Sequence, residues 1–247
     1  MTIASKHAVH FYDEESFLLG SMPAAIKGAL TRGEGAVVIA TAPHIEALTQ
    51  ALREDGLSID QLIEEDRLDF RDAEKTLASL LVDGIPDGVR FDARIGRLVR
   101  RKLRKFGRLT AFGEMVNLLW QDGNRDAAIA LEHLWNDLLK SSPFELTCAY
   151  RLNVLDSGVD LHHLDGVCDA HNQLFPAEDP VKIEQAFFQA VRQAVPASQI
   201  EMLEAWIARN GVPHATSIRE GVSWLRRFLP EYAPVVLRLA RSFVAAS

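Results

Sequence analysis

Apolar runs alternate with helical patterns along the first two thirds of the chain, and this order predicts an α/β fold. HAVHFY at residues 7–12 alternates in the manner of a strand, and AVVIAT at residues 36–41 is an unbroken apolar run typical of a buried parallel strand. Strands that alternate with helices are parallel and joined by right-handed crossovers, so we expect a three-layer α/β/α domain with helices on both faces of a mainly parallel sheet. Three further strands are expected at residues 67–73, 109–115 and 144–152, with helices at 17–30, 43–56, 74–82 and 90–108 and two more between the fourth and fifth strands.

The last third of the chain has a different pattern. Residues 158–176 are expected to form a helix that packs back on the α/β domain, and PAEDPVK at 176–182 is typical of a boundary. Beyond it we find only helical periodicity, with turns predicted at Pro196, Asn210–Gly211 and Pro230. We therefore divide the chain into an α/β domain, residues 1–176, and a small all-α module for interaction or dimerisation, residues 177–247.

The composition limits the class of protein and the cellular compartment in which we expect it. The 247 residues are 48% hydrophobic, and the mean hydropathy is -0.01. Charges interrupt every apolar run before the roughly 18 residues that a membrane span needs, and the N-terminus lacks the pattern of a signal peptide. We expect a cytoplasmic protein, with no membrane partner and with Cys148 and Cys168 as reduced thiols.

The formal net charge of -7 argues against a protein that binds nucleic acid over its whole surface. One stretch is basic: residues 90–108 concentrate Arg and Lys around an apolar stripe at helical spacing. We interpret it as an amphipathic helix with a solvated outer face. The alternative is a docking face for an acidic partner or an anion.

Glu114 lies where the fourth strand would leave the sheet, in the sequence LTAFGEM. Ligands of open α/β sheets bind beyond the carboxyl ends of the strands, so Glu114 is expected to face a bound molecule. The alternative is that Glu114 only caps the helix that follows it.

The carboxyl ends of the first, fourth and fifth strands are expected to meet at one edge of the sheet. A pocket there would be aromatic with a few polar groups, which suits a small organic ligand. Trp120 and Trp135 are interpreted as core residues because they lie on apolar stripes of their helices. The predicted ligand-binding residues are His10, Phe11, Tyr12, Glu114, Asn117, Cys148, Tyr150 and His171.

A metal site is a competing interpretation for the histidines and cysteines. His163, Cys168 and His171 form an HxxxxCxxH pattern, and imidazole with thiolate suits zinc. A structural zinc site usually shows four clearly paired ligands, so we expect no metal. His171 could equally donate a hydrogen bond to a carboxylate such as Glu114. No cofactor is assigned.

The first loop lacks the features of a phosphate-binding loop. DEESFLLGSM at residues 13–22 contains no GxxxxGK[ST] and is acidic where a phosphate needs backbone amides and a lysine. Phosphoryl transfer without the lysine and the magnesium-binding hydroxyl has lost its charge-neutralising groups, so we do not expect an enzyme. Nucleotide binding without hydrolysis stays open, because arginines of residues 90–108 could replace the lysine.

Several segments in one order carry a family resemblance. HAVHFYDEESFLLGSM, RLDFRDAEKTLASLL, FGEMVNLLWQDGN, LEHLWN, FELTCAY and VCDAH together resemble the MEDS sensory domain, over about residues 7–176. The resemblance implies a fold similar to RecA and the circadian-clock ATPases, with a degenerate phosphate loop. It also implies ligand or signal sensing, rather than turnover, in prokaryotic transcription regulators or histidine kinases.

We therefore predict a non-catalytic sensor of a small molecule that acts through its helical tail on a regulatory partner, a kinase or a transcription factor, as a homodimer. One alternative is a nucleotide-binding protein or weak ATPase of the RecA-like superfamily. Another is a regulator that binds DNA through its C-terminal helices, for which IARNGVPHATSIREGVSWLRR gives a weak helix-turn-helix match with GVP as the turn.

Overall fold

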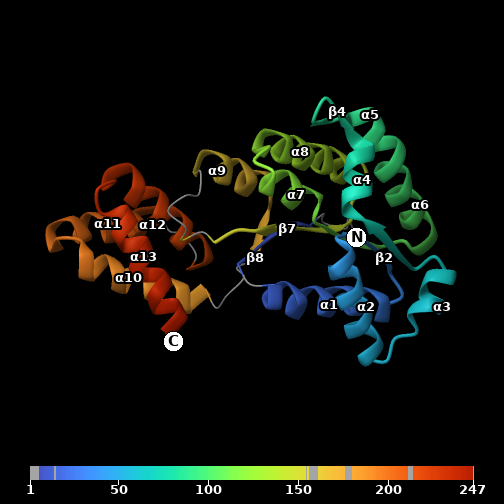
Figure 1. Ribbon diagram of the computed structural model, residues 1–247, viewed down its shortest axis with the longest axis horizontal. Helices are drawn as coiled ribbons and strands as arrows, with labels where there is room; N and C mark the ends of the chain where they lie inside the picture. The colour runs from blue at the N-terminus through green and yellow to red at the C-terminus, as the bar shows by residue number, and fades with distance from the viewer. Residues whose placement is uncertain are drawn as a thin grey trace. The chain divides into compact units, whose positions relative to one another are not determined.

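The computed structural model divides into two compact units (Figure 1). It describes residues 6–13, 15–153, 155, 161–175, 180–210 and 214–246. We call the first the α/β unit; it comprises Met1–His10, Glu14–Arg151 and Asp165–Phe175. The second, the helical unit, comprises Phe11–Asp13, Leu152–Leu164 and Pro176–Ser247. Its longest segment begins at Pro176, and two short segments from the earlier part of the chain join it.

The α/β unit is built on a mostly parallel sheet. The strand order is β3-β2-β6-β7-β1-β8 within the described residues. The pairs β2/β3, β2/β6, β6/β7 and β1/β8 are all parallel, as the alternation of strands and helices predicts. The strands are β1 Lys6–Tyr12, β2 Gly35–Ala40, β3 Leu68–Asp72, β6 Leu109–Gly113, β7 Glu145–Arg151 and β8 Gln173–Phe175.

Helices lie on either side of these strands (Figure 1). On one side, α1 contacts α2, β2 and β6, and on the other side α7 contacts α4, α8 and β7. Every residue of β2 and of β6 is buried, as expected for strands covered on both faces. The helices are α1 Glu15–Thr31, α2 Ala42–Glu54, α3 Ile59–Glu64, α4 Ala73–Leu80, α5 Gly88–Phe91, α6 Arg97–Phe106, α7 Met115–Gln121, α8 Arg125–Ser141 and α9 Leu161–Ala170, with a π-helical turn at Asp92–Gly96.

Three elements differ from the sequence prediction. Residues 173–175 form strand β8, whereas one helix was predicted over 158–176, of which 158–160 and 176 lie outside the described residues. The reason is tertiary: Asn172 donates its backbone N–H to the carbonyl oxygen of His7 and accepts the His7 N–H on its side chain, which aligns β8 with β1. The other two are helix α3 and the hairpin β4 Leu81–Val82 with β5 Ile85–Pro86, which occupies a predicted turn.

The helical unit has its own core. α10 Pro180–Ala194 contacts α12 His214–Phe228 and α13 Ala233–Ala246, while α11 Ala197–Asn210 contacts α10 and α12. The predicted turns at Pro196 and Pro230 are confirmed, since both residues lie between helices. Gly211 and the GVP segment proposed as a helix-turn-helix turn lie outside the described residues. The buried centre includes Phe187, Val191, Val222, Leu225, Val236 and Leu237.

None of the described helices combines the length and the apolar character that crossing a membrane requires.

Candidate functional site

Glu114 lies immediately after β6 and is fully buried. It occupies the N-cap position of α7, but its side chain makes no capping hydrogen bond. Instead, its carboxylate accepts the backbone N–H of Thr41 at 2.8 Å and contacts His44 Nδ1 at 2.5 Å. The structure thus contradicts the interpretation of Glu114 as a helix cap only. We call Glu114 and His44 the edge pair.

The edge pair lies where the chain leaves two neighbouring strands toward opposite faces of the sheet. β2 and β6 are neighbours in the sheet, and α2 follows β2 on one side while α7 follows β6 on the other (Figure 1). Adjacent strands whose chains leave on opposite faces open a crevice at their carboxyl ends, which is where α/β proteins bind ligands. His44 and Glu114 therefore occupy the position where that rule places a ligand.

The hydrogen bond to Glu114 raises the pKa of His44 above its ordinary value of 6.5, although burial acts in the opposite direction. Charges on Glu15 and Arg151 also act on His44, and these two residues form an ion pair of 3.6 Å. Because Nδ1 faces the carboxylate, Nε2 is the ring nitrogen left to donate a hydrogen bond to another molecule.

The other residues predicted for this edge have different roles. Asn117 is buried in α7, and its side-chain oxygen accepts the backbone N–H of Arg151 at 2.8 Å, which ties α7 to β7. His10 Nδ1 lies 3.2 Å from the hydroxyl of Ser21 in α1, and burial lowers the pKa of His10. Phe11 and Tyr12 are buried residues of β1 that belong to the helical unit.

Cys148, Tyr150 and His171 come together, but around a residue that the sequence analysis did not select. Glu132 of α8 is fully buried, and it receives the Tyr150 hydroxyl at 2.8 Å and the Cys148 thiol at 3.3 Å. Its carboxylate also lies 3.3 Å from His7 Nε2 and 3.4 Å from His171 Nε2. His171 therefore faces Glu132 and not Glu114, which the sequence analysis named as one possible carboxylate partner.

We call His7, Glu132, Cys148 and His171 the buried cluster. One signal could have identified Glu132: it falls on the apolar stripe of α8, flanked by the buried residues Ala128, Leu131 and Trp135. A carboxylate on such a stripe needs partners inside the protein. Of the HxxxxCxxH pattern, only His171 belongs to this cluster.

Burial governs the protonation of the cluster. It raises the pKa of Cys148 and of Tyr150 well above their ordinary values, and the negative charge on Glu132 acts in the same direction. Burial also opposes ionisation of Glu132, but the charge of His171 and hydrogen bonds from His7 and Tyr150 lower the pKa of Glu132 overall. The carboxylate is therefore ionised while the thiol and the phenol remain donors.

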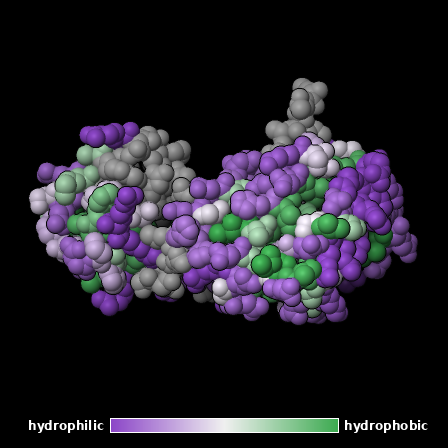
Figure 2. Space-filling model, turned by 90° about the horizontal axis from the view of Figure 1, so that it is seen from above, coloured by the Kyte–Doolittle hydropathy of each residue, from purple (hydrophilic) through white to green (hydrophobic). Residues whose placement is uncertain are grey.

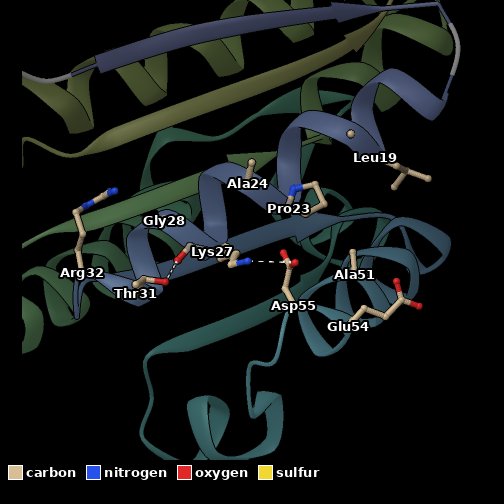
Figure 3. Close-up of a pocket in the computed structure, with 11 residues that line it drawn as sticks. Leu19, Pro23, Ala24, Lys27, Gly28, Thr31, Arg32, Ala51, Glu54 and Asp55 are labelled. Carbon is tan, nitrogen blue, oxygen red and sulfur yellow. Dashed lines mark hydrogen bonds and ion pairs between the residues drawn. The ribbon is translucent and has the colours of Figure 1, made fainter.

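The described residues of the α/β unit form a shallow groove and a smaller pocket, among other surface features. A shallow groove of about 730 Å³ lies along α1 and α2, where Lys27 and Asp55 point toward each other and form an ion pair of 3.1 Å (Figure 3). None of the predicted ligand-binding residues lines this groove. A smaller pocket of about 350 Å³ is lined by His7, His133, Asn136 and His171, so it reaches both histidines of the buried cluster.

Several basic residues of helix α6 form ion pairs with acidic residues of the same unit. Lys102 is fully buried and lies 2.8 Å from Asp66, to which Arg101 also binds at 3.1 Å. Arg100 binds Asp92 at 2.8 Å. These ion pairs favour the interpretation of an amphipathic helix over that of a docking face for an anion.

A protein-family model described as the MEthanogen/methylotroph, DcmR Sensory domain (MEDS) matches residues 6–171. The chain belongs to the MEDS family. The resemblance found in the sequence is thereby confirmed for the family itself. A search of the curated proteins finds no match.

The MEDS match contains the edge pair and the whole buried cluster, and it ends at His171. Helices α10 to α13 lie beyond it along the chain. Membership of a sensory-domain family indicates a sensing role in signalling for this MEDS protein.

Proposed function

We propose that this MEDS domain is a non-catalytic sensor that binds a small organic molecule at the carboxyl edge of its sheet. The observation that carries the proposal is the edge pair at the junction of β2 and β6. Glu114 holds His44 by one nitrogen, so that Nε2 can donate a hydrogen bond to an oxygen atom of the ligand. The ligand class is therefore a small molecule with a carbonyl, carboxylate or hydroxyl oxygen.

We further propose that the MEDS domain has a RecA-like three-layer fold in which the phosphate loop is degenerate. Helices on both sides of a mostly parallel sheet support the fold, and the acidic residues Asp13 and Glu15 after β1 support the degenerate loop. Glu15 lies in the first turn of α1. Its negative charge would repel a phosphate group, which would otherwise bind the partial positive charge of the helix N-terminus. For the same reasons, we propose that the domain binds its ligand without hydrolysing a nucleotide.

The signal is proposed to leave through the helical unit. A ligand that binds one arrangement of the edge more tightly shifts the population toward it, and helices α10 to α13 transmit the change to a regulatory partner such as a kinase or a transcription factor. Among its described residues, the helical unit exposes several large apolar side chains, which suit contact with a partner or with a second copy in a homodimer. These are Val181, Met202, Phe228 and Val235.

The α/β unit offers a second apolar surface for a partner. Figure 2 shows hydrophobic side chains gathered among hydrophilic ones on the face of this unit that is seen from above. In the β4–β5 hairpin and α5, Val82, Ile85 and Val89 are 41%, 59% and 78% exposed. Apolar exposure of this extent in adjacent elements supports a protein-binding role.

A thermal-shift screen with small alcohols, aldehydes, ketones and carboxylic acids tests the proposed site. We expect at least one class to raise the melting temperature of the unmodified chain, because a ligand that binds only the folded state stabilises it. The Glu114→Gln and His44→Gln variants should lose this response, whereas Glu145→Gln, whose carboxylate binds Arg108 just before β6, should keep it. An equal response in all four proteins would place the ligand elsewhere.

A further inference from the structure

Four potential metal ligands from separate segments converge in the buried cluster. His7 comes from β1, Glu132 from α8, Cys148 from β7, and His171 from the segment between α9 and β8. One ligand atom from each residue lies within 4.8 Å of all the others. The side chains of Glu132 and His171 are 0% exposed, and that of His7 is 3% exposed.

The spacing of these atoms fits tetrahedral coordination. Zinc binds nitrogen and oxygen at about 2.0–2.1 Å and sulfur at about 2.3 Å, so tetrahedral ligands lie about 3.3–3.8 Å apart. Cys148 Sγ is 3.5 Å from His7 Nε2 and 3.3 Å from Glu132 Oε2, and His7 Nε2 is 3.3 Å from the same oxygen. His171 Nε2 is 3.4 Å from Glu132 Oε1. Small side-chain adjustments would thus suffice to close the site.

Both histidines are oriented by their other ring nitrogen. His7 Nδ1 lies 2.9 Å from Asn136 Oδ1, and the Asn136 amide nitrogen donates to the carbonyl oxygen of Ala170, which identifies Oδ1 as the acceptor. His171 Nδ1 lies 2.6 Å from the carbonyl oxygen of Val167. Both Nδ1 atoms therefore donate, and in the neutral tautomers both Nε2 lone pairs point into the cluster.

Such an arrangement requires a cation. Two imidazole lone pairs directed at a buried carboxylate repel it, unless a proton or a metal ion lies between them. Among the described residues, His171 Nε2 is buried and has no hydrogen-bond partner, although it points at Glu132. A divalent ion with one thiolate and one carboxylate would give a site with no net charge, which is the least costly form for a fully buried group.

We propose that His7, Glu132, Cys148 and His171 bind one Zn²⁺ ion in a four-coordinate site. The thiolate and the two imidazoles select zinc over magnesium and calcium, which prefer oxygen ligands. On binding, Cys148 forms a sulfur–zinc bond and its thiol proton is released to solvent. The site fastens α8 and the segment before β8 to strands β1 and β7. It does not depend on the small-molecule site proposed at the edge pair.

The surroundings provide support and access. Asn136 lies one turn after Glu132 in α8 and holds His7 in place, and the Tyr150 hydroxyl donates to Glu132 Oε1 at 2.8 Å. Outer hydrogen bonds of this kind orient metal ligands and contribute to affinity. The pocket of about 350 Å³ lined by His7 and His171 gives the ion a route from solvent.

Cobalt spectroscopy of the full chain tests the proposal. The purified protein is stripped with a chelator and titrated with Co²⁺, and Zn²⁺ is then added. We expect one Co²⁺ per chain, with a thiolate-to-cobalt charge-transfer band and the intense visible bands of a tetrahedral ion, all of which disappear when Zn²⁺ displaces it. A chain that gives neither band would overturn the site, whatever the behaviour of any variant.

Matched variants identify the ligands. Cys148→Ser should abolish the charge-transfer band, while Cys168→Ser, which removes the other buried thiol, should keep it. His171→Gln should weaken Zn²⁺ binding by about 100-fold or more, and Asn136→Ala by about 10- to 100-fold. His133→Gln, which alters the same pocket outside the cluster, should leave affinity unchanged. Far-ultraviolet circular dichroism confirms folding, and retention of the band by folded Cys148→Ser would contradict the assignment.

Discussion

Glu114 and His44 face each other at the carboxyl ends of β2 and β6, with 2.5 Å between Glu114 Oε1 and His44 Nδ1. The two residues are far apart in the sequence, and the parallel pairing of β2 with β6 brings them together. The same carboxylate binds the backbone N–H of Thr41 and so anchors the start of α2. One buried side chain therefore joins two strands, one helix and the histidine that we propose contacts the ligand.

The stability of the protein should depend on the ionisation of His44. The pKa of His44 in the folded state is raised above the ordinary value of 6.5. The ion pair therefore makes its full contribution to the stability of the folded state below pH 6.5. This contribution should be lost as the pH rises through the raised folded value. We expect the urea midpoint of the unmodified chain to fall over that interval by more than the midpoint of His44→Gln. Identical pH profiles would contradict the ion pair, because His44 is the only histidine that differs between the two proteins.

Replacing Glu114 by Gln should preserve the fold and lower its stability. The amide oxygen can still accept the Thr41 N–H, but the ion pair with His44 is lost, for which we expect a cost of about 1–3 kcal/mol in the free energy of unfolding. Glu145→Gln removes a carboxylate that is 35% exposed and binds Arg108 at 3.3 Å, and it should cost less than about 0.5 kcal/mol. Urea unfolding of both variants measures the difference. An equal loss of unfolding free energy in the two variants would mean that the buried ion pair of Glu114 stabilises the fold no more than the more exposed one of Glu145.

Asp66 should be needed to hold the buried ammonium group of Lys102. The Asp66→Asn variant keeps a residue type that tolerates the backbone φ of 57° at this position, so it isolates the loss of charge. We expect a loss of about 2–4 kcal/mol, because the nearest remaining carboxylate is that of Asp69, 3.8 Å from Lys102. The backbone carbonyl oxygen of residue 66 still accepts a hydrogen bond from the ammonium group, but it does not neutralise its charge. Asp60→Asn, at an exposed ion pair with Arg53, should change the midpoint little. If the two variants unfold at the same urea concentration, the Lys102 contact is not important for stability.

Gly221 should be sensitive to the addition of a single methyl group. A Cβ atom there would lie 2.9 Å from Cε1 of Phe187 in the core of the helical unit, so Gly221→Ala is expected to cost about 1–3 kcal/mol. Gly20 in α1 has nothing within 4 Å of the corresponding position, and Gly20→Ala should stabilise by about 0.5–1 kcal/mol. Thermal unfolding of the two variants gives opposite signs in our account. A stabilising effect of Gly221→Ala would contradict the packing of α12 on α10.

The sequence predicts those features of the fold that depend on the local pattern of hydrophobic and polar residues. The apolar run of β2 and the position of Glu114 after β6 follow from hydrophobic pattern and strand ends. The partners of these residues depend on tertiary pairing: His44 follows a different strand, and His171 reaches Glu132 only because β8 pairs with β1. Strand β8 itself is three residues long and has no local signal that distinguishes it from the end of a helix. The MEDS motifs identify the family because they combine segments that periodicity treats separately.

Native mass spectrometry of the purified full chain, before and after denaturation, tests the sensing account most directly. We predict that the native protein carries a small organic molecule that is lost on denaturation and is depleted in Glu114→Gln relative to Glu145→Gln. A bound zinc ion would appear as a separate mass increment, so the two proposed sites can be judged independently. Native protein without any organic adduct, or a bound nucleotide that the protein hydrolyses, would contradict a non-catalytic sensor of a small organic molecule.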